Sequence, residues 1–161
     1  MNTVKAKYSA LDVAKWFIRR NRIEEAKEAD KLSLLKLLKL LYYAEGCSLA
    51  LNDRSLFSED IIAWEHGPVV IEVYNKYKSD PFNLPFDDEE DDVSDSFSDE
   101  DNECLEQVFQ VFGAYSAWAL RNKTHKEEPW LEATNNGQSL NHAISRDTMK
   151  SYFFKTYVEE S

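Results

Sequence analysis

The sequence predicts a single, mainly helical compact domain with a buried leucine-rich helix at its centre and one short extended segment. Three observations carry this prediction. The chain has 161 residues, a length that suits one domain with its own core. It contains only 4 Gly and 4 Pro, so few positions force a turn, while 9 Phe, 8 Tyr and 4 Trp supply apolar volume. Apolar residues recur at helical spacing along most of the chain.

The first two helices have clear starting signals. Ser9 and Asp12 have the spacing of a capping box, so a helix is expected to begin near Ser9. A second helix is expected from Ser33 to Leu51, and its leucines cover most of its circumference. An apolar surface on nearly every side indicates a helix at the centre of its domain.

Two features of this second helix carry further predictions. Lys36, Lys39 and Tyr43 leave one polar stripe, and the two lysines are expected to form the wet edge of the helix. Gly46 lies inside the helical pattern, where glycine costs about 1 kcal/mol relative to alanine. Close packing of a neighbouring element would explain this glycine.

A turn is expected at Asn52-Asp53, followed by a short strand or extended segment at 61–64. Pro68 suits the first position of a helix, which is expected to end at Asp80-Pro81. In this interpretation His66, Gly67 and Pro68 form a rigid corner that orients the helix.

The second half of the chain begins with an acidic loop at about 81–101. Residues 87–106 carry 12 acidic and no basic side chains, so this tract supplies the whole net charge of −11. A helix is expected from 99–101 to Leu120, and a short one begins at Pro129. Asn135-Asn136-Gly137 predicts a helix C-cap, and Ser145 opens the last helix.

Composition argues against several classes of function. The acidic balance makes nucleic acid an improbable partner. Cys47 and Cys104 are too far apart in sequence to indicate a disulfide framework, and no metal-ligand spacing occurs. Met1 to Ser9 has no apolar signal-peptide core, and no apolar run approaches a membrane span. We therefore expect a cytoplasmic protein with reduced cysteines and no membrane, metal or cofactor.

Two local clusters admit a structural and a chemical interpretation. Around His66 the structural interpretation is a rigid corner, and the alternative is that His66 or Glu65 faces a partner or acts in catalysis. Around His125 the structural interpretation is a turn before Pro129, and the alternative is an acid–base pair with Glu127. No nucleophile motif accompanies either cluster, which favours the structural interpretation.

The acidic tract at 87–103 also has two interpretations. Its composition is typical of a solvated loop. The alternative is a mimic of nucleic-acid phosphates that docks on a basic partner surface.

Four ordered segments together resemble a known family. Residues 34–46, with Tyr42-Tyr43-Ala44, resemble the "LKLQKLLYYAQG" element of the Panacea-domain antitoxins, also called SocA-like or GepA-like, which are common in prophages. Residues 57–74 resemble the family's "AWxxGPVxxxVY" element, and 115–130 its "THxExPW" element. Residues 144–154 are similar to its terminal "I…YF" element. The chain departs from the pattern at Leu38 and Glu45, where the family usually carries Gln, and at Cys47, where it usually carries an aromatic residue.

The resemblance implies an antitoxin of a toxin–antitoxin pair, with no enzymatic activity. Its partner would be a cognate toxin protein encoded by an adjacent gene, neutralised by direct binding. The alternative within the family is an adaptor that delivers the toxin to a ClpXP-type protease, and an enzyme using His125 and Glu127, or His66 and Glu65, is the alternative of another class. The family-motif residues, expected to be mainly structural with some partner contacts, are Lys36, Lys39, Tyr42, Tyr43, Trp64, His66, Gly67, Pro68, Val69, Val70, Tyr74, Thr124, His125, Glu127, Pro129 and Trp130.

Overall fold

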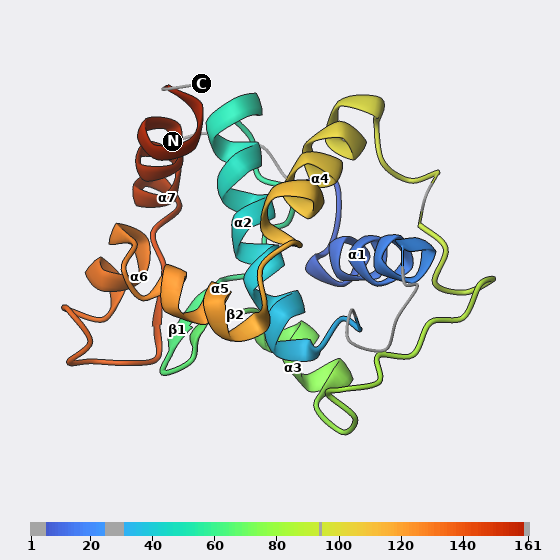
Figure 1. Cartoon of the computed structure of the whole chain (residues 1–161). Coiled ribbons are helices and arrows are strands. Elements are labelled where there is room, and N and C mark those ends of the chain that lie inside the picture. The colour runs from blue at the N-terminus through green and yellow to red at the C-terminus, as the bar shows by residue number, and fades with distance from the viewer. Residues whose placement is uncertain (1–5, 25–30, 94, 160–161) are drawn as a thin grey trace.

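The computed structural model describes residues 6–24, 31–93 and 95–159. Residues 1–5, on which the expectation of no signal peptide largely rests, lie outside them. The fold is mainly helical, with a small three-stranded sheet at one end, as the sequence predicts (Figure 1). Helices from both ends of the chain meet around one central helix.

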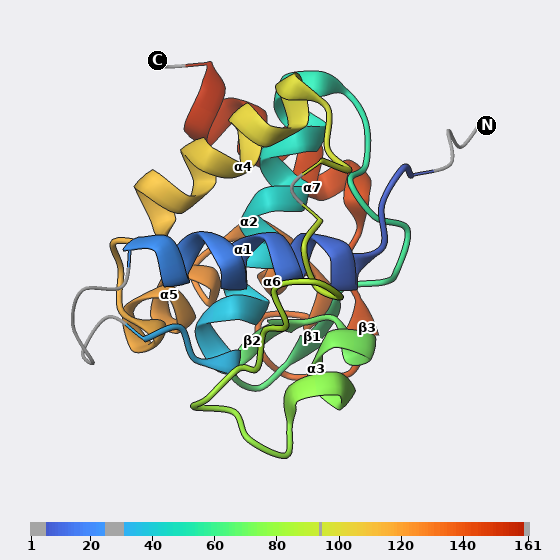
Figure 2. The same ribbon diagram turned by 90° about the vertical axis from the view of Figure 1, so that its right-hand side faces the viewer.

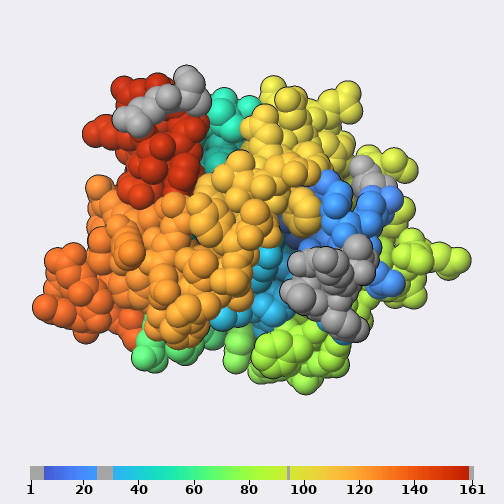
Figure 3. Space-filling model, viewed as in Figure 1, coloured from blue at the N-terminus to red at the C-terminus, as the bar shows by residue number. Residues whose placement is uncertain are grey.

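That central helix is α2, Leu34–Asn52. It packs against α1, α4, α5 and α7, and every residue from Leu37 to Leu49 is buried. Ser33 caps its N-terminus by accepting from the Lys36 N–H at 3.3 Å, and Asp53 ends it in the left-handed conformation. The space-filling view shows α4 and α5 covering the middle of α2 (Figure 3). The predicted central helix is confirmed.

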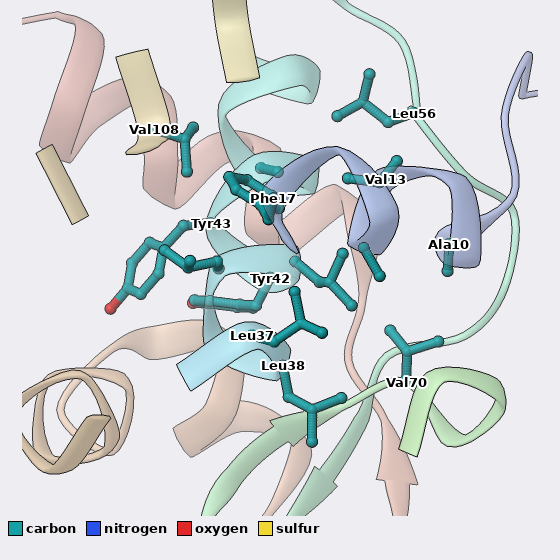
Figure 4. Packing of buried hydrophobic residues seen from close by; sticks show 14 of the residues in the cluster. Ala10, Val13, Phe17, Leu37, Leu38, Tyr42, Tyr43, Leu56, Val70 and Val108 are labelled. Carbon is teal, nitrogen blue, oxygen red and sulfur yellow. The ribbon is translucent and has the colours of Figure 1, made fainter. Parts of the chain in front are cut away.

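Helix α1, Ala10–Glu24, crosses α2 (Figure 2). The predicted capping box is present, because the Asp12 N–H donates to Ser9 Oγ at 3.0 Å and the Ser9 N–H donates to Asp12 Oδ2 at 3.2 Å. Val13 and Phe17 of α1 join Leu37 and other α2 side chains in the buried cluster (Figure 4).

The sheet contains β1 (Ile62–Trp64), β2 (Gly67–Val69) and β3 (His142–Ala143), in the order β2-β1-β3 and antiparallel throughout. The strand expected near Ile61 is confirmed as β1. The placement of Pro68 at a helix start is wrong. Pro68 pairs with Ala63 in the β-hairpin, and α3, Ile71–Tyr77, begins only after Val70.

No helix or strand occurs between α3 and α4 in the described residues of this segment, 78–93 and 95–98. The acidic side chains at 87–90 are exposed, as expected of a solvated loop. The tract is nevertheless attached to α1, where Lys15 lies 3.1 Å from Asp91 and Arg19 lies 3.7 Å from Asp92. Phe97 is buried and its ring centre lies 4.1 Å from that of Tyr8.

The single helix expected up to Leu120 is two helices. α4, Asp99–Phe112, is capped by Ser98, and α5, Ala117–Thr124, is capped by Ser116. The Ser116 hydroxyl accepts from the Ala119 N–H at 3.0 Å and starts a new helix within the range that was expected to be one.

The C-terminal part agrees with its predicted signals. α6, Glu128–Ala133, has Pro129 in its first turn, and Asn135, Asn136 and Gly137 all have positive φ beyond its end. Ser145 caps α7, Arg146–Phe153, which continues as a π-helix, η2, Phe154–Val158.

Helix α7 approaches α2 closely at Gly46. A Cβ atom at this position would overlap the Phe153 ring, so only glycine lets the two helices meet here. The Phe153 ring in turn contacts Tyr42 and Tyr43, at 5.3 Å and 5.8 Å between ring centres. This contact is the close packing that the sequence predicted for Gly46.

A buried ion pair fixes the start of α7. Glu45 has no exposed surface and accepts from Arg146 Nε at 2.7 Å and from the Leu56 N–H at 2.8 Å. Arg146 also donates to the carbonyl oxygens of Phe57 and Glu59, at 3.0 Å and 2.7 Å. The pair therefore joins α2, the segment after it and α7.

We expect Gly46→Ala to lower the free energy of unfolding by about 1–3 kcal/mol, because the added methyl group overpacks the Phe153 ring. Alanine alone would stabilise a helix by about 1 kcal/mol. Urea unfolding measures the difference, and Gly46→Ala combined with Phe153→Leu should recover part of it. A variant more stable than the wild type would contradict the contact.

Arg146→Ala should lower the free energy of unfolding by about 3 kcal/mol, because it leaves the Glu45 carboxylate buried without its cation. Glu45→Gln serves as the matched comparison, since it keeps an acceptor for the Leu56 N–H and removes the buried charge. Equal losses in the two variants, measured by urea unfolding, would show that the ion pair does not hold α7.

Candidate functional site

The family-motif residues meet at the β1–β2 hairpin, where α2, α5 and α6 converge. Gly67 follows the two-residue turn with φ of 110°, a conformation that favours glycine. A Cβ atom here would lie 2.6 Å from Lys39 Cε and 2.9 Å from Thr124 Oγ1. Gly67 therefore lets the hairpin sit directly against α2 and the end of α5.

Helices α5 and α6 hold the hairpin through its backbone. The ring of His125 lies between two carbonyl groups, with Nδ1 2.6 Å from the Arg121 oxygen and Nε2 2.5 Å from the Glu65 oxygen. Trp130 Nε1 donates to the Trp64 oxygen at 3.0 Å, and the rings of His125 and Trp130 lie 4.2 Å apart. Through these contacts, His125 and Trp130 position the hairpin.

Lys39 is the largest departure from the expected arrangement of α2. The prediction that Lys36 and Lys39 form a wet edge is wrong for Lys39, which has no exposed surface, and Tyr43 of the same stripe is also fully buried. Lys39 Nζ lies 3.4 Å from the Pro68 oxygen, whereas the half-buried Lys36 donates to the Gly113 oxygen at 2.6 Å. Burial, with a smaller contribution from the Arg121 charge, lowers the pKa of Lys39 to about 7. Lys39 therefore faces the hairpin instead of water, and Lys36 and Tyr43 face the end of α4.

Glu127 forms a second buried polar cluster. It is 2% exposed, accepts from the Tyr42 hydroxyl at 3.1 Å and also accepts from the Tyr157 hydroxyl. Burial raises the pKa of Glu127, although the hydroxyl donors and Lys123, 4.0 Å away, oppose the shift. The Tyr43 hydroxyl is buried without a hydrogen-bond partner in the described chain, while its ring stacks on Phe112 at 4.0 Å.

The remaining motif residues complete the packing. Val69 at the end of β2 and Val70 directly after it are buried, and the Trp64 ring contacts the Tyr74 ring edge-on at 5.0 Å. Pro129 is buried in the first turn of α6. The structure thus brings the four motif segments together around α2.

Neither proposed acid–base pair shows a direct contact. Within residues 6–24, 31–93 and 95–159, no hydrogen bond joins His125 to Glu127 or His66 to Glu65. His125 faces carbonyl oxygens, and Glu127 faces tyrosines. His66 accepts from Arg121 Nε at 3.2 Å on the outer side of the hairpin. The geometry favours the structural interpretation of both clusters.

Features of other site classes are also missing from the described part of the chain. It has no group of three or more His, Cys, Asp or Glu residues placed to hold a metal ion, and no helix there could cross a membrane. Cys47 and Cys104 are both buried and free, and burial raises the pKa of Cys104 to about 12. Buried thiols of this kind are poor nucleophiles.

Sequence reasoning overlooked two arginines. Arg146 neutralises Glu45, but nothing in the local sequence links residues 101 positions apart. Arg121 reaches His66 of the hairpin and lies over the Trp118 ring at 4.5 Å. The sequence did offer one indication of Arg121, because it lies in the stretch 115–126, where aromatic residues are followed by basic ones.

We expect Lys39→Met to change how stability depends on pH. Between pH about 7 and 10.5 Lys39 is protonated in the unfolded chain and largely neutral in the folded protein. The unfolded state therefore binds more protons, and Lys39 contributes stability that rises with pH in this window. The free energy of unfolding of the wild type minus that of the variant should rise by up to about 1.4 kcal/mol per pH unit. Urea unfolding between pH 6 and 9.5 measures this difference, and one that is constant or falls with pH would contradict a buried, neutral Lys39.

Comparison with known proteins places this arrangement in a family. Comparisons with curated proteins and with solved structures gave no match. The family model described as "Antitoxin SocA-like, Panacea domain" matches residues 37–131, from the buried part of α2 through Trp130 in α6. This match covers more than half of the chain and includes the hairpin and the helices that hold it. The chain therefore belongs to the SocA-like antitoxin family defined by the Panacea domain.

Proposed function

We propose that this protein is an antitoxin that neutralises a cognate toxin, encoded by an adjacent gene, by direct protein–protein binding. The observation that carries the proposal is the family match over residues 37–131. The two buried, free cysteines are consistent with action in the cytoplasm, where thiols stay reduced. We also infer that residues 1–161 act as one domain, since α1 and α7, outside the matched range, both pack on α2.

The motif side chains contact other parts of the same fold, which supports a binding function over catalysis. Lys39, His125 and Glu127 all point to partners within the fold, and each is at least partly removed from solvent. A catalytic group needs access to a substrate within hydrogen-bond reach. The exposed side chains of types enriched at binding hot spots, such as Trp118 and Tyr115, lie elsewhere, at α5.

Co-expression with the product of the adjacent open reading frame tests the proposal. Induction of that product alone should stop growth, and this protein should restore growth and co-purify with it as a stable complex. An interface of this kind buries about 1,600 Å² in total. His66→Ala removes an exposed imidazole and the acceptor of Arg121 Nε, so it should lower the affinity for the product only modestly and leave rescue of growth intact.

The other outcomes separate the alternatives. Rescue with loss of the partner protein, abolished in a host without ClpXP, would identify a proteolytic adaptor. If the wild type restores growth without forming a complex, and a folded His66→Ala variant fails to restore growth, the protein acts by catalysis. A wild-type protein that neither binds the product nor restores growth would contradict the antitoxin proposal.

A further inference from the structure

The outward side of α5 exposes aromatic side chains together with cations. Trp118 is 60% exposed and Tyr115 is 41% exposed. Trp118, Arg121 and Lys123 belong to α5 itself, while Tyr115 lies just before its N-cap Ser116 and Lys126 just after its C-cap His125. α5 runs across the side of the molecule that faces the viewer (Figures 1 and 3). We refer to Tyr115, Trp118, Arg121, Lys123 and Lys126 as the α5 face.

The charge of the α5 face is opposite to that of the chain. Residues 107–126 contain three basic residues and no acidic one, in a protein of net charge −11. Arg20, Arg54 and Arg146 each lie within 4.0 Å of a carboxylate. In the described part of the chain, Arg121 and Lys126 have no carboxylate within that distance. Of the three cations of the α5 face, Arg121 and Lys126 therefore keep a positive charge that no carboxylate within 4.0 Å neutralises, whereas Lys123 lies 4.0 Å from Glu127.

The side chains of the α5 face are held in place before any partner arrives. The Arg121 guanidinium lies 4.5 Å from the centre of the Trp118 ring, and its Nε donates to His66 at 3.2 Å. Lys123 lies 4.0 Å from Glu127 and 5.3 Å from the centre of the Tyr157 ring. Side chains that are already ordered lose less entropy on binding.

A hollow of about 460 Å³ lies beside these residues. Tyr115, Lys123, Lys126, Glu127 and Tyr152 line it, together with Ala119 and Asn122 of α5. It is open to solvent, so it suits a side chain that projects from a partner surface. The two lysines at this hollow favour a partner side chain that carries a negative charge.

We propose that the α5 face and its adjoining hollow dock an acidic surface of the toxin, an inference that rests on the antitoxin function proposed above. Charge complementarity carries the choice of partner, because unpaired cations on an acidic protein attract a negatively charged surface. Exposed Trp, Tyr and Arg are the residue types that dominate binding energy at protein interfaces. A nucleic acid is disfavoured as the occupant, because the three cations at 107–126 of an acidic chain fall short of the large basic patch that nucleic-acid-binding domains carry. A few complementary charges are enough at a protein–protein interface.

Two variants test the α5 face in the full-length protein, with the purified product of the adjacent open reading frame as the probe. Trp118→Ala should weaken binding about 30-fold, the size expected for a hot spot. Lys126→Glu should weaken it about tenfold through charge repulsion, and wild-type affinity should fall as salt rises from 0.05 to 0.5 M, about the range over which screening becomes strong. Both side chains are exposed, so both variants should melt at the wild-type temperature.

Phe82→Ala and Lys78→Glu are the matched controls, because both side chains are exposed and lie outside α5. They should bind like the wild type. If the wild type binds and all four variants bind equally well, the α5 face is not the docking surface, and the antitoxin function stands. If the wild type binds a 20-nucleotide poly-U RNA and Trp118→Ala abolishes that binding, the face serves nucleic acid and the proposal is overturned. A wild type that does not bind the product would instead contradict the proposed function itself.

Discussion

A helix buried on every side leaves its polar groups no access to water, and α2 is such a helix. Most polar side chains in its buried part pair with a group outside the helix, because an unpaired polar group in the interior costs several kcal/mol. The Tyr43 hydroxyl is the exception, since it has no hydrogen-bond partner in the described chain. Lys39 reaches the hairpin, Tyr42 donates to Glu127 at the start of α6, and Glu45 pairs with Arg146 of α7. These pairings bring the distant parts of the chain to fixed positions around α2.

This constraint also explains why the family motif says little about the partner. Tyr42 of α2 donates to Glu127, and Gly67 lets the hairpin lie against α2. His125 and Trp130 hold that hairpin through its backbone. Under the proposed function, the buried motif is the scaffold, and partner specificity falls to exposed positions such as Trp118 of α5, which can change without disturbing these contacts.

Local signals were read correctly at several helix ends. Ser33 and Ser145 begin helices because their hydroxyls accept nearby N–H groups, and Gly46 was correctly assigned to close packing. The same local signal was missed at Ser116, whose cap divides the helix expected to reach Leu120. The other errors arose where distant contacts decide. The sequence pattern predicted a solvent-exposed position for the polar Lys39, but α5 and the hairpin cover this side chain. Proline is compatible with both a helix start and a short strand, and the pairing of Pro68 with Ala63 places it in a strand. The two residues of β3 are too few to leave a pattern.

The account separates a buried motif that builds the scaffold from an exposed α5 face that binds, and hydrogen–deuterium exchange tests this separation most directly. The measurement compares the free protein with its complex with the product of the adjacent open reading frame. The account predicts new protection at 115–126 and unchanged, already slow exchange in α2 and the hairpin. Unchanged exchange at 115–126, or protection that changes mainly in α2 and the hairpin, would contradict it.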